Sequence, residues 1–69
     1  MNKFVIKREM GDDLKFYKQD DVMSFPEAKA VLATWKDLVF DGNAFLGNRN
    51  TELAGYLNGV DYLFKIEKV

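Results

Sequence analysis

A single change of apolar period, at Pro26, constrains the fold of this chain more than any other feature of its sequence. From Pro26 onward, apolar side chains recur at spacings of three and four, the pattern of one face of an α-helix. They are Ala28, Val31, Leu32, Trp35, Leu38 and Val39. Ser24 and Glu27 have the spacing of a capping box, although Phe25, which precedes proline, resists helical geometry. We therefore predict one amphipathic helix of about four turns, beginning at the box or one residue later.

Before the helix, the runs KFVIKREM and LKFYK are rich in β-forming residues and are separated by GDD. This arrangement predicts a β-hairpin with a three-residue loop. In that register one face carries Phe4, Ile6, Met10, Leu14 and Phe16, and the outward face carries Lys3, Val5, Lys7, Glu9, Lys15 and Tyr17. The lysines of both predicted strands therefore point away from the helix, except Lys18, which lies opposite Ile6.

The last third of the chain has two interpretations. Asn58-Gly59 is typical of a type I′ turn, and folding back on it sets Leu57 against Val60 and Leu53 against Phe64. The alternative is a short helix over ELAGYLN that ends at Gly59. The hairpin explains more residues and is favoured, and both interpretations end in the same strand, VDYLFKIEKV.

These elements predict a small α+β fold in which one amphipathic helix packs on one face of an antiparallel sheet, in the order ββαββ, or ββααβ with the short helix. A chain of 69 residues has room for one core, so residues 1–69 are expected to form a single domain. No cysteine is present to form a disulfide or a thiolate metal site. The N-terminus lacks a signal-peptide pattern and no apolar run approaches membrane-spanning length, so a cytoplasmic location is expected.

The segment DGNAFLGNRNTE, from Asp41 to Glu52, has the length and the acidic ends of a calcium-binding loop. However, Phe45 stands where a third oxygen ligand is needed, and Leu46 stands where the chain must turn with positive φ. We therefore expect a connector with no metal. The segment is expected to leave the helix at Asp41 and to turn again in GNRN.

The side chains needed for catalysis are scarce. The chain has no histidine and no cysteine, and its one serine, Ser24, is assigned as a helix cap. Ser-His, Cys-His and zinc chemistries are therefore excluded. The pairs Asp12-Asp13 and Asp20-Asp21 are typical turn residues, and no glycine motif for phosphate binding is present. We expect a protein that is not an enzyme and has no cofactor.

A binding surface is the favoured interpretation, because six Phe, three Tyr and one Trp are many for one small core. Phe40, Phe45 and Leu46 fall in a segment expected to be exposed, and Tyr56 lies on the polar face of the second hairpin. Trp35 is a further candidate, although its place on the helix stripe is more typical of a core residue. These residues predict contact with a protein partner.

Two alternatives use other features of the chain. Lys3, Lys7, Lys15 and Tyr17 together resemble the charged and stacking groups of single-stranded nucleic-acid binders. A net charge of −1 and a pI near 5.2 argue against that function. The other alternative is a structural homodimer in which the aromatic residues complete a core that is too small for one chain.

The opening KFVIKR, the helix start FPEA and the final YLFKIEKV give the chain a layout similar to that of many small phage- or prophage-encoded accessory proteins. This resemblance concerns the general layout and identifies no site. It implies a protein that binds one host protein and blocks or redirects it. The prediction is thus a non-enzymatic protein-binding module, acting as an inhibitor or adaptor.

Overall fold

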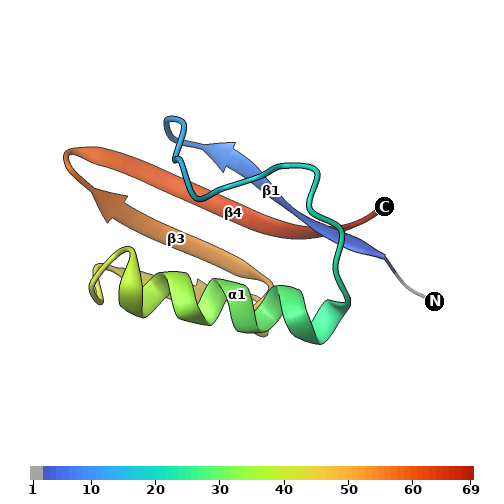
Figure 1. Ribbon diagram of the computed structural model, residues 1–69. Coiled ribbons are helices and arrows are strands. Elements are labelled where there is room, and N and C mark those ends of the chain that lie inside the picture. The colour runs from blue at the N-terminus through green and yellow to red at the C-terminus, as the bar shows by residue number, and fades with distance from the viewer. Residues whose placement is uncertain (1–2) are drawn as a thin grey trace.

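The computed structural model describes residues 3–69 and contains one antiparallel sheet and one helix. The elements are β1 (Phe4–Met10), α1 (Phe25–Leu38), β2 (Ala44–Gly47), β3 (Glu52–Leu57) and β4 (Val60–Lys68). The strands lie in the order β1-β4-β3-β2, and α1 runs along one face of the sheet (Figure 1). The predicted α+β class is confirmed. The first two residues of the predicted domain 1–69 lie outside the described residues.

Helix α1 begins where the capping box predicts. The hydroxyl of Ser24 accepts a hydrogen bond from the Glu27 N–H at 3.2 Å, and the Glu27 carboxylate accepts one from the Ser24 N–H at 3.2 Å. These two bonds satisfy backbone N–H groups at the start of the helix, which have no acceptor within the helix itself. The helix therefore starts at Phe25, despite the proline that follows. At the other end, Leu38 is 80% exposed and its place in the predicted stripe is wrong, while Val39 still packs against the core.

The C-terminal hairpin forms in the predicted register, and the short-helix alternative is wrong. Asn58 and Gly59 have φ values of 52° and 82°, as a type I′ turn requires. Leu57 lies opposite Val60, and Leu53 lies opposite Phe64. The twist of this turn matches that of the strands it joins, which is why two residues specify the pairing of β3 with β4.

The predicted N-terminal hairpin is wrong, and the order is β-α-β-β-β where ββαββ was expected. Strand β1 pairs with β4, at the far end of the chain. Phe16 and Tyr17 both contact Trp35, with ring centroids 5.2 and 6.0 Å apart. Neighbouring residues on a strand point to opposite faces and cannot share such a contact. Packing against Trp35 on α1 thus replaces strand formation in this segment.

The outer edge of β1 is closed by the same segment. Its Tyr17 hydroxyl donates a hydrogen bond to the Ile6 carbonyl at 2.7 Å and accepts one from the Arg8 N–H at 3.0 Å. Further along, Phe4 and Met23 exchange two backbone hydrogen bonds of 2.8 Å each. A side chain and an isolated bridge therefore take the place of the second strand of the predicted hairpin.

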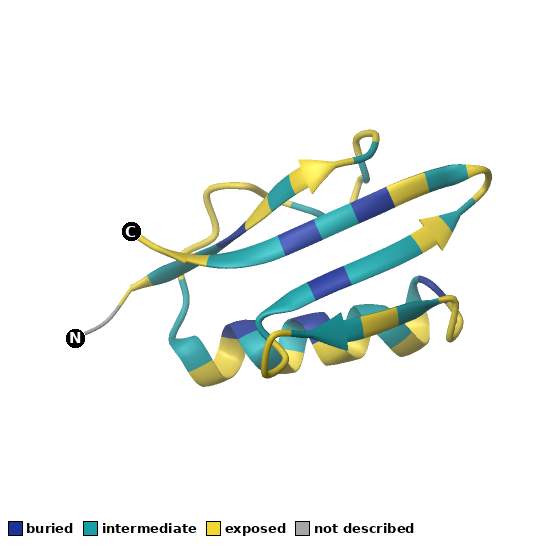
Figure 2. Ribbon diagram, turned by 180° about the vertical axis from the view of Figure 1, so that it is seen from behind, coloured by how far each residue is buried: buried dark blue, intermediate teal, exposed yellow. Residues whose placement is uncertain are grey.

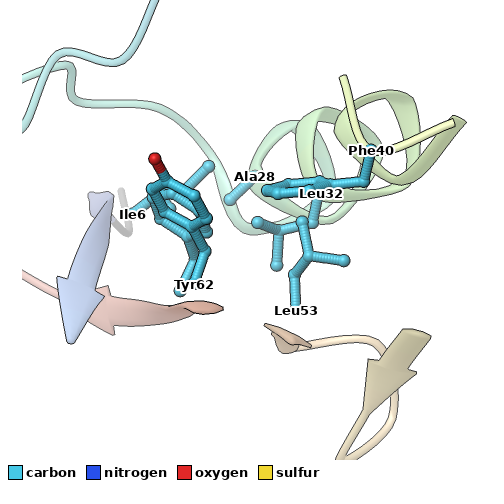
Figure 3. Packing of buried hydrophobic residues seen from close by; sticks show 7 residues of the cluster. Ile6, Ala28, Leu32, Phe40, Leu53 and Tyr62 are labelled. Carbon is cyan, nitrogen blue, oxygen red and sulfur yellow. The ribbon is translucent and has the colours of Figure 1, made fainter. Parts of the chain in front are cut away.

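The core lies between α1 and the inner face of the sheet (Figure 3). Its buried members are Ile6, Ala28, Leu32, Phe40, Leu53, Tyr62 and Phe64. Gly55 on β3 leaves room for the Phe40 ring, since a Cβ at this position would lie 2.7 Å from a ring atom.

Among the described residues, no helix has the length and apolar character needed to cross a membrane.

Candidate protein-binding surface

The face of the sheet opposite α1, here called the outer face, carries every second residue of each strand. In Figure 2, which views the molecule from behind, β2 lies in front of α1. The outer face is formed by Val5, Lys7, Glu9 and, after a shift of register, Met10 of β1, Phe45 and Gly47 of β2, Glu52, Ala54 and Tyr56 of β3, and Asp61, Leu63, Lys65 and Glu67 of β4. No helix covers this face in residues 3–69, so its side chains define the surface available to a partner.

One half of the outer face is charged, with two lysines and three glutamates. Lys7 lies 3.9 Å from the Glu67 carboxylate, and Lys65 lies 3.6 Å from the Glu9 carboxylate. Exposed pairs of this kind contribute about 0–1 kcal/mol each, so their main effect is to keep this half polar and close to neutral. A surface with paired charges of both signs offers little attraction to a polyanion.

The other half of the outer face is apolar and is here called the apolar patch. A single row crosses all strands in register: Phe45 lies opposite Ala54, Ala54 opposite Leu63, and Leu63 opposite Met10. Tyr56 stands beside this row. Phe45 is 66% exposed, and Met10 and Tyr56 are each 54% exposed.

A shallow hollow of about 470 Å³ lies within the apolar patch. Its floor includes Ala54 and Leu63, and its polar lining includes Asn43 and Asp61. Ala54 has the smallest side chain in the row, so a gap remains between the larger side chains on either side. The hollow has a size and an apolar character that suit one or more apolar side chains of another molecule.

Met10, Ala54 and Leu63 were not among the residues expected from the sequence. Met10 was assigned to the same face as Ile6, but the register of β1 and β4 shifts between Arg8 and Met10. This irregularity inserts an extra residue and turns Met10 onto the outer face. Strict alternation along KFVIKREM gives no sign of such a bulge. The proximity of Tyr56 to Leu63, however, follows directly from the predicted hairpin.

The predicted partner-binding residues separate into two groups. Phe45 and Tyr56 lie together in the apolar patch. Leu46 points to the helix side of β2 and packs against the core, and Trp35 packs against the Phe64 ring at 5.0 Å. The expectation that Phe40 is exposed is wrong, because only 1% of its surface is accessible.

Phe40 is buried because the chain reverses immediately after α1. Asp41 and Gly42 have φ values of 49° and 82°, which turn the backbone and leave the Phe40 ring beneath Gly55. The segment 41–52 is likewise more regular than the expected connector, because Ala44–Gly47 forms strand β2.

The residues of the nucleic-acid alternative do not share one surface. Tyr17 packs on the helix side against Trp35 and Phe64, so the prediction that it points away from the helix is wrong. That prediction depended on the hairpin that does not form. Lys7 lies on the outer face in its pair with Glu67, while Lys15 lies in the segment between β1 and α1. Lys3 is exposed just before β1.

No protein-family model, curated protein or solved structure matches this chain. The likeness to phage accessory proteins therefore stays a prediction.

Proposed function

We propose that this chain is a non-enzymatic protein-binding module that holds its partner on the apolar patch. The observation that carries the proposal is the row of Phe45, Ala54, Leu63 and Met10 across the whole sheet, with Tyr56 beside it and a hollow within it. Single exposed apolar residues are ordinary on protein surfaces. A contiguous set bordered by polar groups is typical of an interaction site.

The lining of the hollow defines the chemistry of the partner. An apolar or aromatic side chain of the partner fills the hollow, in contact with Phe45 and Leu63. Asn43 and Asp61 also line the hollow, and their polar groups supply hydrogen bonds that orient the partner. This combination of a central aromatic anchor and a polar rim is the usual anatomy of a protein interface.

Binding without chemistry makes the module an inhibitor or an adaptor. The sequence lacks histidine and cysteine, so the proposal assigns no catalytic step to the patch. In this proposal the chain acts by covering a surface of its partner. Because the lysines in the charged half of the outer face lie in ion pairs with glutamates, the apolar patch is favoured over a nucleic-acid site.

The test is affinity capture from a cell lysate with the tagged chain, with and without nuclease. Wild-type protein is compared with Phe45→Ala, which removes the most exposed ring of the patch. Leu38→Ala is the matched control, because Leu38 is also strongly exposed but lies at the end of α1. Circular dichroism of all three proteins confirms that the fold is retained.

We expect one stoichiometric protein to be retained after nuclease treatment by the wild type and by Leu38→Ala, and lost with Phe45→Ala. Retention of the same protein by a folded Phe45→Ala variant would remove the patch from the proposal. Capture that collapses on nuclease treatment, with nucleic acid recovered in its absence, would assign the chain to nucleic-acid binding instead.

A further inference from the structure

One edge of the sheet is covered by another segment of the chain, and the opposite edge is open. The edge of β1 is closed by the Tyr17 hydroxyl and by the bridge between Phe4 and Met23. The opposite edge is β2, which has a neighbour on one side only, and Figure 2 shows no strand beyond it. Since unpaired strand edges promote association, a fold that closes one edge and leaves the other open directs association to β2.

The hydrogen-bond pattern identifies which groups of β2 are free. The Tyr56 N–H donates to the Asn43 carbonyl at 3.0 Å, so this opposed pair is a hydrogen-bonded one. Such pairs alternate along an antiparallel ladder. Phe45 therefore bonds to Ala54 on β3, while Ala44 and Leu46 direct their N–H and C=O groups away from the sheet.

The same alternation is fixed independently on the other side of β3. The Ile66 N–H donates to the Thr51 carbonyl at 3.0 Å, which directs every second residue of β3, counted from Thr51, toward β4. Glu52, Ala54 and Tyr56, which lie between them, then direct their backbone N–H and C=O groups toward β2. This agrees with the hydrogen bond from the Tyr56 N–H. Over residues 3–69, no hydrogen bond uses the outward groups of Ala44 or Leu46.

Apart from its shortness, strand β2 has none of the features that usually discourage edge pairing. Its sequence, AFLG, contains no lysine, no proline and no charge. Its pairing with β3 is continuous, without a bulge that would twist the edge away. Its shortness is the only protective feature among those that natural sheets use.

We propose that β2 is the interface for a second copy of this chain, which adds its own β2 antiparallel across a two-fold axis at Phe45. Ala44 and Leu46 stand on either side of Phe45, so the axis sets Ala44 opposite the second copy's Leu46, and Leu46 opposite the second copy's Ala44. Both pairs are then hydrogen-bonded pairs, and all the outward N–H and C=O groups of these residues find partners. The two sheets become one continuous sheet.

Charge at the ends of β2 favours a second copy over an unrelated strand. Asp41 precedes β2 and Arg49 follows it at the same distance from Phe45. Both residues lie in turns with positive φ, so the two-fold register sets the turn that carries Asp41 beside the second copy's turn that carries Arg49. Both side chains are exposed, and in the described part of the chain neither forms an ion pair.

This dimer goes beyond the proposed partner binding, because it uses the backbone of β2 where the partner uses side chains of the outer face. The two surfaces meet at Phe45. In the dimer the two Phe45 side chains lie next to each other across the axis, in the closely spaced non-hydrogen-bonded position. The two apolar patches then join into one surface on one face of the combined sheet.

The first experiment measures molar mass by sedimentation equilibrium over a range of protein concentrations. The wild type is expected to approach twice the 8.0 kDa chain mass as its concentration rises. Ala44→Pro removes one outward N–H that takes no part in the pairing with β3, so the fold is retained and the dimer is lost. A wild type that stays monomeric up to millimolar concentration, or a dimer that survives in Ala44→Pro, would overturn the proposal.

The second experiment tests the register by charge reversal. Asp41→Arg alone and Arg49→Asp alone each place like charges at both ends of the interface, and each is expected to weaken dimerisation about tenfold. An equimolar mixture of the two variants restores opposite charges at both ends and therefore restores the dimer as a heterodimer. Circular dichroism of each variant serves as the folding control. A mixture no tighter than its components would exclude this register.

Discussion

Phe40 and Phe45 lie five positions apart and provide a direct test of how this fold divides its aromatic residues. Phe40 is buried to 1% exposure, while Phe45 is 66% exposed on the outer face. Both residues were predicted from the sequence to be exposed. The structure predicts opposite results for their replacement by alanine.

The magnitudes follow from burial. Removing a fully buried Phe ring costs about 3–5 kcal/mol, because apolar contacts are lost and a cavity remains. The Phe40 ring contacts Tyr62, with centroids 5.7 Å apart, and fills the space above Gly55. Single domains have about 0.05–0.15 kcal/mol of stability per residue, which is roughly 3–10 kcal/mol for this chain. Phe40→Ala therefore removes a large share of the free energy of unfolding, whereas Phe45→Ala changes that free energy by less than about 0.5 kcal/mol.

The assay is urea denaturation followed by the fluorescence of Trp35, the single tryptophan, which packs against Phe64 in the core. Because Phe40→Ala can unfold the chain completely, Phe40→Leu is measured beside it and is expected to cost about 1–2 kcal/mol. In thermal unfolding, a loss of about 4 kcal/mol lowers Tm by roughly 15–30 °C. A cost below about 1 kcal/mol for Phe40→Ala, or equal costs at the two positions, would refute this assignment of core and surface.

Three further predictions concern stability and are measured by the same denaturation assay. Ser24→Ala removes the cap of α1 and is expected to cost about 1 kcal/mol, whereas Ser24→Asp is expected to cost almost nothing; equal losses would show that the cap contributes little. Tyr17→Phe keeps the ring but leaves the Ile6 carbonyl and the Arg8 N–H without their partner, for an expected cost of about 1–2 kcal/mol, and an unchanged midpoint would mean that water replaces the hydroxyl. Gly55→Ala places a Cβ 2.7 Å from the Phe40 ring and is expected to cost about 1–3 kcal/mol; a neutral result would indicate that the ring moves freely.

The parts of the fold that the sequence predicts well are those specified by neighbouring residues. The capping box at Ser24 sets the start of α1, and Asn58-Gly59 sets the pairing of β3 with β4. In both cases local hydrogen bonds or backbone conformations decide the outcome within a few positions. These signals can be read without knowing the rest of the molecule.

The parts that sequence reasoning missed depend on distant contacts. The strand at Phe4–Met10 is present as predicted, but its neighbour is β4 and not the segment that follows it. That segment is held by Trp35, whose position depends on how α1 crosses the sheet. Local propensity in LKFYK favours a strand but carries no information about this contact.

The candidate site was predicted only in part, because its remaining residues depend on contacts and turns that the local sequence does not specify. Phe45 and Tyr56 were identified from their expected exposure, and the structure places them in one patch. Phe40 was misassigned because the turn at Asp41 and Gly42, which carries its ring back under the sheet, leaves only a weak local signal. Met10 was placed on the wrong face because a single-residue bulge reverses the alternation that follows it.

The pairing of β1 with β4 has a consequence for synthesis on the ribosome. Within residues 3–69, β1 precedes the other strands of the sheet, yet its partner strand is β4, which follows them all. During translation α1 and then the β3–β4 hairpin can form from local signals, while β1 stays unpaired until β4 has emerged. We therefore expect closure of the sheet to be a late step, which follows the appearance of β4.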